Sequence, residues 1–96
     1  MNPLRIPGSR DPGTAEVYVP PRRYAADGSL RECEPVLVDA VGTLASWTVH
    51  EDEHYGLVDL SDGVRLQALL DPGTHRIGDS YLGVHDPAGN VRFRRA

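Results

Sequence analysis

The stretch "GTLASWTVHEDEHYGLVDLSDGVRLQALL", residues 42–70, decides the expected fold. It continues a run from residue 36 in which Val41, Thr43, Ala45, Trp47 and Val49 recur at period two, as side chains do on one face of a β-strand. Gly42 within this run predicts a bulge or a bend. The stretch therefore predicts a long first strand that ends near residue 50.

Two further strands follow within the same stretch. Residues 55–60 and 64–70 are apolar at alternate positions, and Ser61-Asp62-Gly63 between them is a hairpin turn signal. After a connection rich in strand breakers, residues 81–86 and 91–95 predict a fourth and a fifth strand. We therefore expect an all-β chain with a five-stranded barrel of the OB type, an SH3-like barrel being the alternative.

Upstream of Pro35 the chain reads as an extended N-terminal arm. Prolines and glycines recur over residues 1–15 and are expected to prevent regular structure there. Residues 15–19 predict at most a brief strand, which Pro20-Pro21 ends. The expected organisation is an arm over residues 1–34 and a barrel domain over residues 35–96.

Composition excludes several classes of function. The 96 residues carry a net charge of −4, which argues against a nucleic-acid partner. All ten basic residues are Arg, so Schiff-base chemistry by lysine is excluded. Cys33 is the single cysteine, so no intrachain disulfide and no cysteine-only zinc site can form. The start is too polar for a signal peptide and no apolar run approaches a membrane span, so we expect a cytoplasmic protein.

The letters "HEDEH" at residues 50–54 match the H-E-x-x-H signature of zinc peptidases. That signature requires a helix, because only there do positions i and i+4 share one face. Here the letters lie between two predicted strands, which favours a solvated acidic hairpin tip. A third ligand, His75 or His85, would have to come from elsewhere, and both are expected to be ordinary surface groups.

Several residues are candidates for binding. Arg22 and Arg23 follow two prolines and could contact phosphates or an acidic partner, or could be solvated loop charges. Trp47 is expected in the barrel core rather than as a stacking platform. Arg65 lies on the polar face of the third strand, the usual ligand face of OB folds.

The last strand adds two candidates. Arg92 and Arg94 are expected to alternate outward and form a solvated face, with a phosphate or partner role as the other interpretation.

These motifs resemble an acyl-CoA-associated family in which a zinc ribbon precedes an OB fold and which is often encoded beside thiolases. The order and spacing of the motifs carry the resemblance over most of the chain. The matching pieces are "PPRRY" at 20–24, "GTLASWTV" at 42–49, "GLVDLSDGVRLQALL" at 56–70, "RIGDSYLGV" at 76–84 and "VRFRRA" at 91–96.

The chain departs from the family pattern in two places. The family ribbon usually has four cysteines, whereas here only Cys33 is present and Tyr24 stands where the first pair would begin. We therefore expect a degenerate ribbon without zinc. The link at residues 50–54 is also shorter than the family's usual loop.

The resemblance implies a non-catalytic accessory subunit that stabilises a thiolase-like acyl-CoA enzyme (a thiolase, a synthase or a steroid side-chain aldolase). Its partner would carry the catalysis, and a coenzyme A thioester could lie at their interface. No tightly bound cofactor is expected. Arg22, Arg23, Tyr24, Trp47, Arg65, Arg92 and Arg94 are the expected ligand or partner contacts. The alternatives are a single-stranded nucleic-acid-binding OB module and, less well supported, a metallohydrolase.

Overall fold

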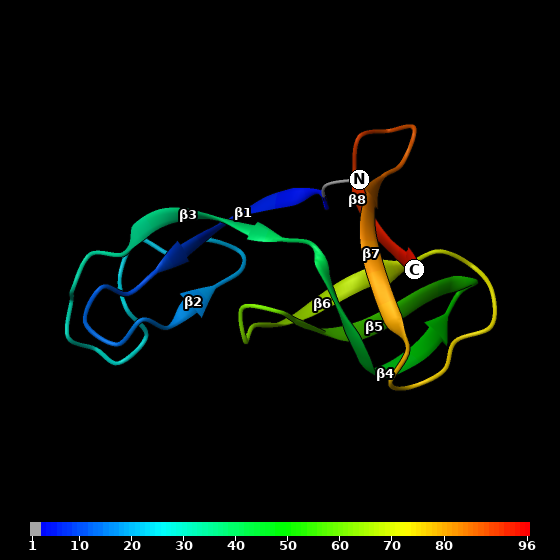
Figure 1. Ribbon diagram of the computed structural model, residues 1–96, viewed down its shortest axis with the longest axis horizontal. Coiled ribbons are helices and arrows are strands. Elements are labelled where there is room, and N and C mark those ends of the chain that lie inside the picture. The colour runs from blue at the N-terminus through cyan, green and yellow to red at the C-terminus, as the bar shows by residue number, and fades with distance from the viewer. Residues whose placement is uncertain (1–2) are drawn as a thin grey trace.

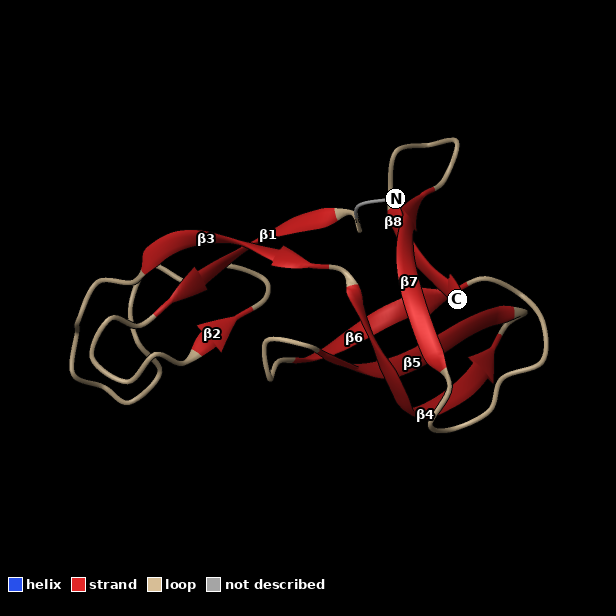
Figure 2. Cartoon of the chain, viewed as in Figure 1, coloured by secondary structure: helices blue, strands red, loops and turns tan. Residues whose placement is uncertain are grey.

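The computed structural model describes residues 3–96, which form two sheets and, within that range, no helix (Figures 1 and 2). A small sheet at the left of Figure 1 precedes a closed barrel at the right. In chain order the strands are β1 (Arg5–Arg10), β2 (Val17–Tyr18), β3 (Glu34–Asp39), β4 (Val41–His50), β5 (Glu53–Leu60), β6 (Arg65–Leu70), β7 (Ser80–His85) and β8 (Val91–Arg95). None of the described residues belongs to a helix long and apolar enough to cross a bilayer.

The N-terminal sheet has the order β2-β1-β3, with both pairings antiparallel. The expectation of no regular structure over residues 1–15 is wrong for Arg5–Arg10, because Pro7 and Gly8 are tolerated inside β1. A Cβ atom on Gly8 would lie 2.8 Å from the carbonyl oxygen of Tyr18, so glycine permits the close approach of β2. Met1 and Asn2 lie outside the described residues. The brief strand expected after residue 15 is confirmed as β2.

The chain changes sheet at Ala40, rather than at residue 35. β3 pairs with β1 from Glu34 to Asp39, and β4 then begins at Val41. The Ala40 N–H donates to the carbonyl of Leu4, and its own carbonyl accepts from the Gly83 N–H, both at 2.7 Å. One fully buried residue therefore bonds to both the N-terminal segment and the barrel.

The barrel closes in the order β4-β5-β6-β8-β7, with β7 returning to β4. All pairings are antiparallel except that of β6 with β8, which consists of the single pair Leu70↔Phe93. This arrangement of five strands is that of an OB fold, and it confirms the predicted fold class. The largest fully buried side chains of the barrel are Tyr81, Phe93, Leu44, Leu70 and Val58.

The first barrel strand departs from the expected alternation. The register shifts between Leu44 and Ser46, so the bulge lies at Ala45 and not at Gly42. The bulge keeps Leu44 and Trp47 on one face, the face of their partners Val58 and Gly56. Leu44 is buried there, but Trp47, nearer the end of β4, is 42% exposed, and the expectation that Trp47 belongs to the core is wrong. Gly42 is needed for a different reason, since a Cβ atom there would overlap the Asp59 carbonyl on β5.

Only two letters of "HEDEH" form the hairpin tip. Glu51 and Asp52 have φ values of 49° and 67°, the left-handed conformation of a two-residue hairpin turn. His50 ends β4 and pairs with Glu53, while His54 belongs to β5. The two histidines therefore do not share a helical face, and the geometry that a zinc peptidase needs is not present.

Candidate functional site

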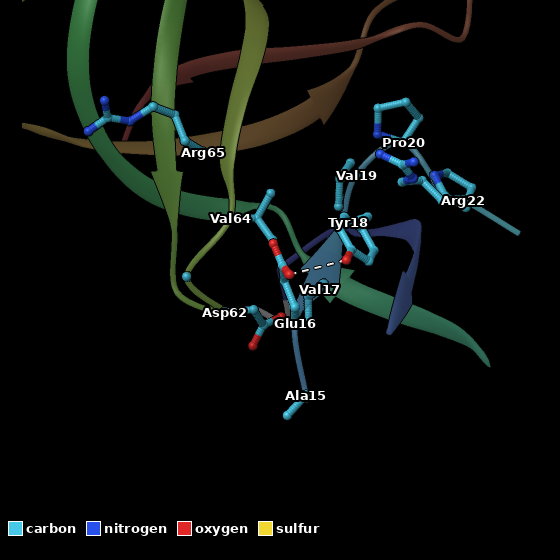
Figure 3. Close-up of a pocket in the computed structure, with 12 residues that line it drawn as sticks. Ala15, Glu16, Val17, Tyr18, Val19, Pro20, Arg22, Asp62, Val64 and Arg65 are labelled. Atoms are coloured by element: carbon cyan, nitrogen blue, oxygen red, sulfur yellow. Dashed lines mark hydrogen bonds between the residues drawn. The ribbon is translucent and has the colours of Figure 1, made fainter. Parts of the chain in front are cut away.

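A cleft of about 620 Å³ separates the N-terminal sheet from the barrel (Figure 3). Residues 15–22 form one wall, and the β5–β6 turn with the start of β6, residues 62–65, forms the other. Figure 3 shows the Arg22 and Arg65 side chains on these opposite walls. Two of the predicted binding residues, distant in sequence, are thus brought to one cleft.

The two arginines of the cleft differ in whether their guanidinium groups are paired with a carboxylate. Arg65 is held by two hydrogen bonds, of 2.7 and 3.1 Å, to the carboxylate of Asp59. Arg22 lies over the ring of Tyr18, with 5.3 Å from its guanidinium carbon to the ring centroid. Within residues 3–96 it has no carboxylate at ion-pair distance. Arg22 is therefore the cation of the cleft that can still bind an anion.

Arg22 is also positioned by its backbone. Its N–H donates to the Ser9 hydroxyl at 2.7 Å, and Ser9 is buried within β1. The side chain is exposed while its Cα position is fixed, which suits a contact residue. Arg23 and Tyr24 lie outside the cleft: Arg23 stacks over Tyr24 and pairs with Glu32 at 3.9 Å.

Trp47 borders a shallow hollow of about 300 Å³ that residues of β4, β5 and β6 form. Its neighbours there include Tyr55, Leu57 and Gln67. The ring is tilted against His75, with centroids 5.1 Å apart. Trp47 is thus a half-exposed residue whose ring contacts the buried ring of His75.

His75 is buried, contrary to the expectation of a surface group. Its Nε2 atom lies 2.8 Å from Nδ1 of His54, and its Nδ1 atom bonds to the hydroxyl of Tyr81. Tyr81 is fully buried, and His75 supplies the one hydrogen-bond partner of its hydroxyl among the described residues. The hydroxyl therefore donates to His75, and His75 Nε2–H donates to His54.

The buried Tyr81 hydroxyl can donate to His75 only while Nδ1 of His75 carries no proton. Burial lowers the pKa of His75, and the nearby His54 and Arg95 lower it further. Burial also raises the pKa of the Tyr81 hydroxyl. The cluster is consequently a polar network that contacts Trp47, and its His75 also lines the pocket beside Arg94 and Arg95.

The last strand separates its two predicted contacts. The Arg92 side chain is 16% exposed and bonds to Asp71, Glu53 and the Leu70 carbonyl. The expectation of an outward, solvated Arg92 is therefore wrong, because this side chain joins β8 to β5 and to the end of β6. Arg94 is exposed and lines a pocket of about 420 Å³ with His75 and Arg95.

A cluster of charges joins the loops of the N-terminal sheet. Asp11 is 1% exposed and accepts from the Gly13 N–H, the Thr14 hydroxyl and two nitrogens of Arg31, at 2.8 to 3.1 Å. Arg31 also bonds to Asp27 at 2.6 Å. The bonds to Arg31 and to the Gly13 N–H hold the pKa of Asp11 well below its usual range.

This cluster does not fit the zinc that the resemblance implies. A guanidinium cation already lies between the two carboxylates, and thiolate ligands are limited to Cys33. No group of three or more His, Cys, Asp and Glu side chains within residues 3–96 is arranged to hold a metal. In this lobe an ion cluster joins the loops of residues 11–16 and 19–33.

A second slot of about 500 Å³ lies beside the cleft, over the seam between β6 and β8. The barrel contributes Leu66–Leu69, Val91 and Phe93, and the N-terminal segments contribute the opposite wall. That wall consists of Ile6, Pro7, Val19, Pro20 and Pro21. The slot is thus lined mainly by apolar side chains.

Comparison with known proteins agrees with this architecture. No protein-family model matches the chain, and no curated protein matches it. A solved structure described as "Ltp2-ChsH2(DUF35) aldolase" is similar, with a TM-score of 0.73 and 19% sequence identity. The match covers 95% of this chain and 84% of that one. The likeness therefore includes both sheets, and at this identity it establishes the fold.

The sequence did contain a signal for the His54–His75–Tyr81 cluster. His54 shares the inward face of β5 with Gly56 and Val58, by simple alternation. Nothing comparable marks His75, because it lies in an irregular connection whose path the local sequence does not determine.

Proposed function

We propose that the chain is a non-catalytic accessory subunit of a thiolase-like or aldolase acyl-CoA enzyme, which stabilises the complex and helps to form the acyl-CoA site. The observation that carries the proposal is the match of both sheets, over 95% of the chain, to a structure described as a DUF35 aldolase. The family resemblance of the sequence motifs points the same way. Shared architecture alone does not specify function, so the residues must also fit the role.

The described residues fit a binding role better than a catalytic one. No Ser, Thr or Cys side chain of residues 3–96 is bonded to a histidine. The carboxylates of Asp11 and Asp27 bond to the side chains of Thr14 and Ser29, and both carboxylates belong to the loop ion cluster with Arg31. Arg22 instead presents an unpaired guanidinium on a fixed backbone at the mouth of the cleft. In the proposal it contacts phosphate groups of a coenzyme A thioester or a carboxylate of the catalytic subunit.

Co-expression with candidate thiolase-like or aldolase proteins tests the proposal directly. We expect a stable hetero-oligomer on size exclusion and a higher rate of acyl-CoA turnover than that of the partner alone. Arg22→Gln should weaken the complex or raise the KM for acyl-CoA. Arg76→Gln, which changes an exposed arginine outside the cleft, is the matched control. A chain that stays monomeric with every candidate and leaves their rates unchanged would refute the proposal.

One observation favours the alternative of a single-stranded nucleic-acid-binding module. Trp47 is half-exposed near the end of β4, where an aromatic ring on an OB fold can stack a base. The acidic turn Glu51–Asp52 follows on the same hairpin and opposes a phosphate backbone. Binding of a fluorescent oligothymidine that weakens steeply with salt, and that Trp47→Ala abolishes, would establish this alternative.

A further inference from the structure

The seam between β6 and β8 leaves one edge of β6 almost unpaired. The two strands share the single pair Leu70↔Phe93, with the Asp71 N–H donating to the Phe93 carbonyl at 2.8 Å. Backbone groups of successive residues point to opposite edges of a strand. Because Asp71 points to the seam, so do Leu69, Gln67 and Arg65.

The other edge of β6 supports this assignment. The Val64 carbonyl accepts from the Leu60 N–H on β5, so the even-numbered residues from Val64 onward bond to β5. Gln67 therefore directs both its N–H and its carbonyl into the seam. Neither group belongs to the pairing of β6 with β8, which among residues 3–96 is limited to Leu70↔Phe93.

The wall opposite this edge is poor in donors. Three of its five residues, Pro7, Pro20 and Pro21, have no N–H to donate to the carbonyls of β6. Between that wall and β6 lies the 500 Å³ slot, whose remaining lining is Val, Ile, Leu, Ala, Phe and the single amide Gln67. An apolar slot with a row of backbone donors and acceptors along one side is a binding site for a β-strand.

We propose that this seam binds an extended, apolar segment of a partner polypeptide, which adds as a strand to the free edge of β6. The edge from Arg65 to Leu69 is about 13 Å long at ~3.3 Å per residue, so it accommodates about four residues. An acyl chain would fill the apolar volume but would leave the Gln67 N–H and carbonyl unpaired, which is costly in an apolar setting. A peptide satisfies both requirements. The inference does not depend on which enzyme the chain assists.

The test uses the whole chain labelled with ¹⁵N and the probe acetyl-Thr-Val-Thr-Val-amide. We expect saturable shifts of the Gln67 and Leu69 amide signals, together with slower hydrogen exchange of both. Two N-methylated versions of the probe are the decisive controls, one methylated at both valines and the other at both threonines. Only one set of N–H groups can face β6, so one version should lose at least tenfold in affinity while the other stays within about twofold.

Variants of the chain provide a second, independent readout. Gln67→Pro removes the seam-facing N–H and should abolish binding, whereas Gln67→Ala keeps the backbone and should bind as the wild type does. If Gln67→Pro does not fold, the N-methyl comparison on the wild-type chain decides alone. Equal affinities of the two methylated probes, no binding at millimolar concentration, or shifts at the seam with decanoate but not with peptide would each overturn the proposal.

Discussion

His54 and His75, 21 residues apart in sequence, meet with Nδ1 of the first 2.8 Å from Nε2 of the second. The contact links the β4–β5 hairpin to the connection before β7, and it continues through His75 to the buried hydroxyl of Tyr81. Trp47 rests on His75 from outside. The half-exposed Trp47 is therefore in contact with a buried titratable group.

Stability should fall below neutral pH because of His75. The pKa of His75 is lower in the folded chain than its ordinary value of about 6.5 in the unfolded chain. At a pH between these two values, the unfolded chain binds a proton at His75 that the folded chain does not bind. The contribution of neutral His75 to the free energy of unfolding is complete above pH 6.5 and is lost as the pH falls. The free energy of unfolding should then decrease by at most about 1.4 kcal/mol per pH unit. Urea midpoints from pH 7.5 to 4.5, read by the fluorescence of Trp47, the single tryptophan, measure it.

Two histidine variants separate this effect from general acid sensitivity. His75→Gln should flatten the pH dependence between pH 6.5 and 5, since the buried imidazole is gone. His85→Gln changes an exposed histidine on β7 and should leave the slope unchanged. Equal slopes in the wild type and His75→Gln would contradict the assignment.

Arg31 should contribute more to stability than an ordinary surface arginine. Arg31→Met removes three bonds to Asp11 and Asp27 and leaves the 1%-exposed Asp11 carboxylate without its cation. We expect a clear decrease in the melting temperature and faster proteolysis in residues 11–31. Arg23→Met is the control, because its pair with Glu32 at 3.9 Å is exposed on both sides and such pairs contribute little.

The ion cluster also predicts insensitivity to chelators. Because Arg31 holds the loops together in place of a metal, EDTA should leave the melting temperature unchanged. A decrease of the melting temperature in EDTA, restored by Zn²⁺, would show that the lobe binds a metal after all.

Arg92 and Arg94 should behave differently although only Phe93 separates them. Arg92→Met removes the bonds to Asp71, Glu53 and the Leu70 carbonyl and should cost about 1–3 kcal/mol of unfolding free energy. Arg94→Met changes an exposed side chain and should stay within about 0.5 kcal/mol of the wild type. Chemical denaturation of the two variants measures the difference. Similar losses of unfolding free energy in Arg92→Met and Arg94→Met would contradict the internal role of Arg92.

Gly42→Ala should destabilise the barrel where β4 crosses β5. The added methyl group meets the Asp59 carbonyl backbone, which cannot move without breaking the pairing of the two strands. We expect a loss of about 1–3 kcal/mol. Thr43→Ala, at an exposed position of the same strand, should be close to neutral, and a Gly42→Ala variant as stable as Thr43→Ala would contradict the predicted overlap.

The barrel could be predicted from the sequence because alternation and turn chemistry act locally. Residues 55–60 and 64–70, with Ser61-Asp62-Gly63 between them, required no knowledge of distant contacts. Trp47 pairs with the inward-facing Gly56, but it lies near the open end of β4 and is half-exposed, and strand alternation does not reveal where a barrel ends.

The site was harder to predict from the sequence, because its geometry depends on contacts between residues that are distant along the chain. Arg22 and Arg65 share a cleft only because β3 leads from the N-terminal sheet into the barrel. Arg92 alternates outward in sequence, yet its guanidinium meets Glu53 and Asp71, which lie 39 and 21 residues away. Side chains that depend on long-range pairing are not determined by the strand pattern alone.

Ala40 has a consequence for how such a chain can change over evolutionary time. Its backbone bonds to Leu4 on one side and to Gly83 on the other, and its side chain is fully buried. Transfer of the N-terminal lobe to another barrel would have to preserve the bonds of Ala40 to both Leu4 and Gly83. We therefore do not expect the lobe to be exchanged between proteins as a separate unit. The ribbon-like lobe and the barrel are expected to be inherited, to melt and to be lost together.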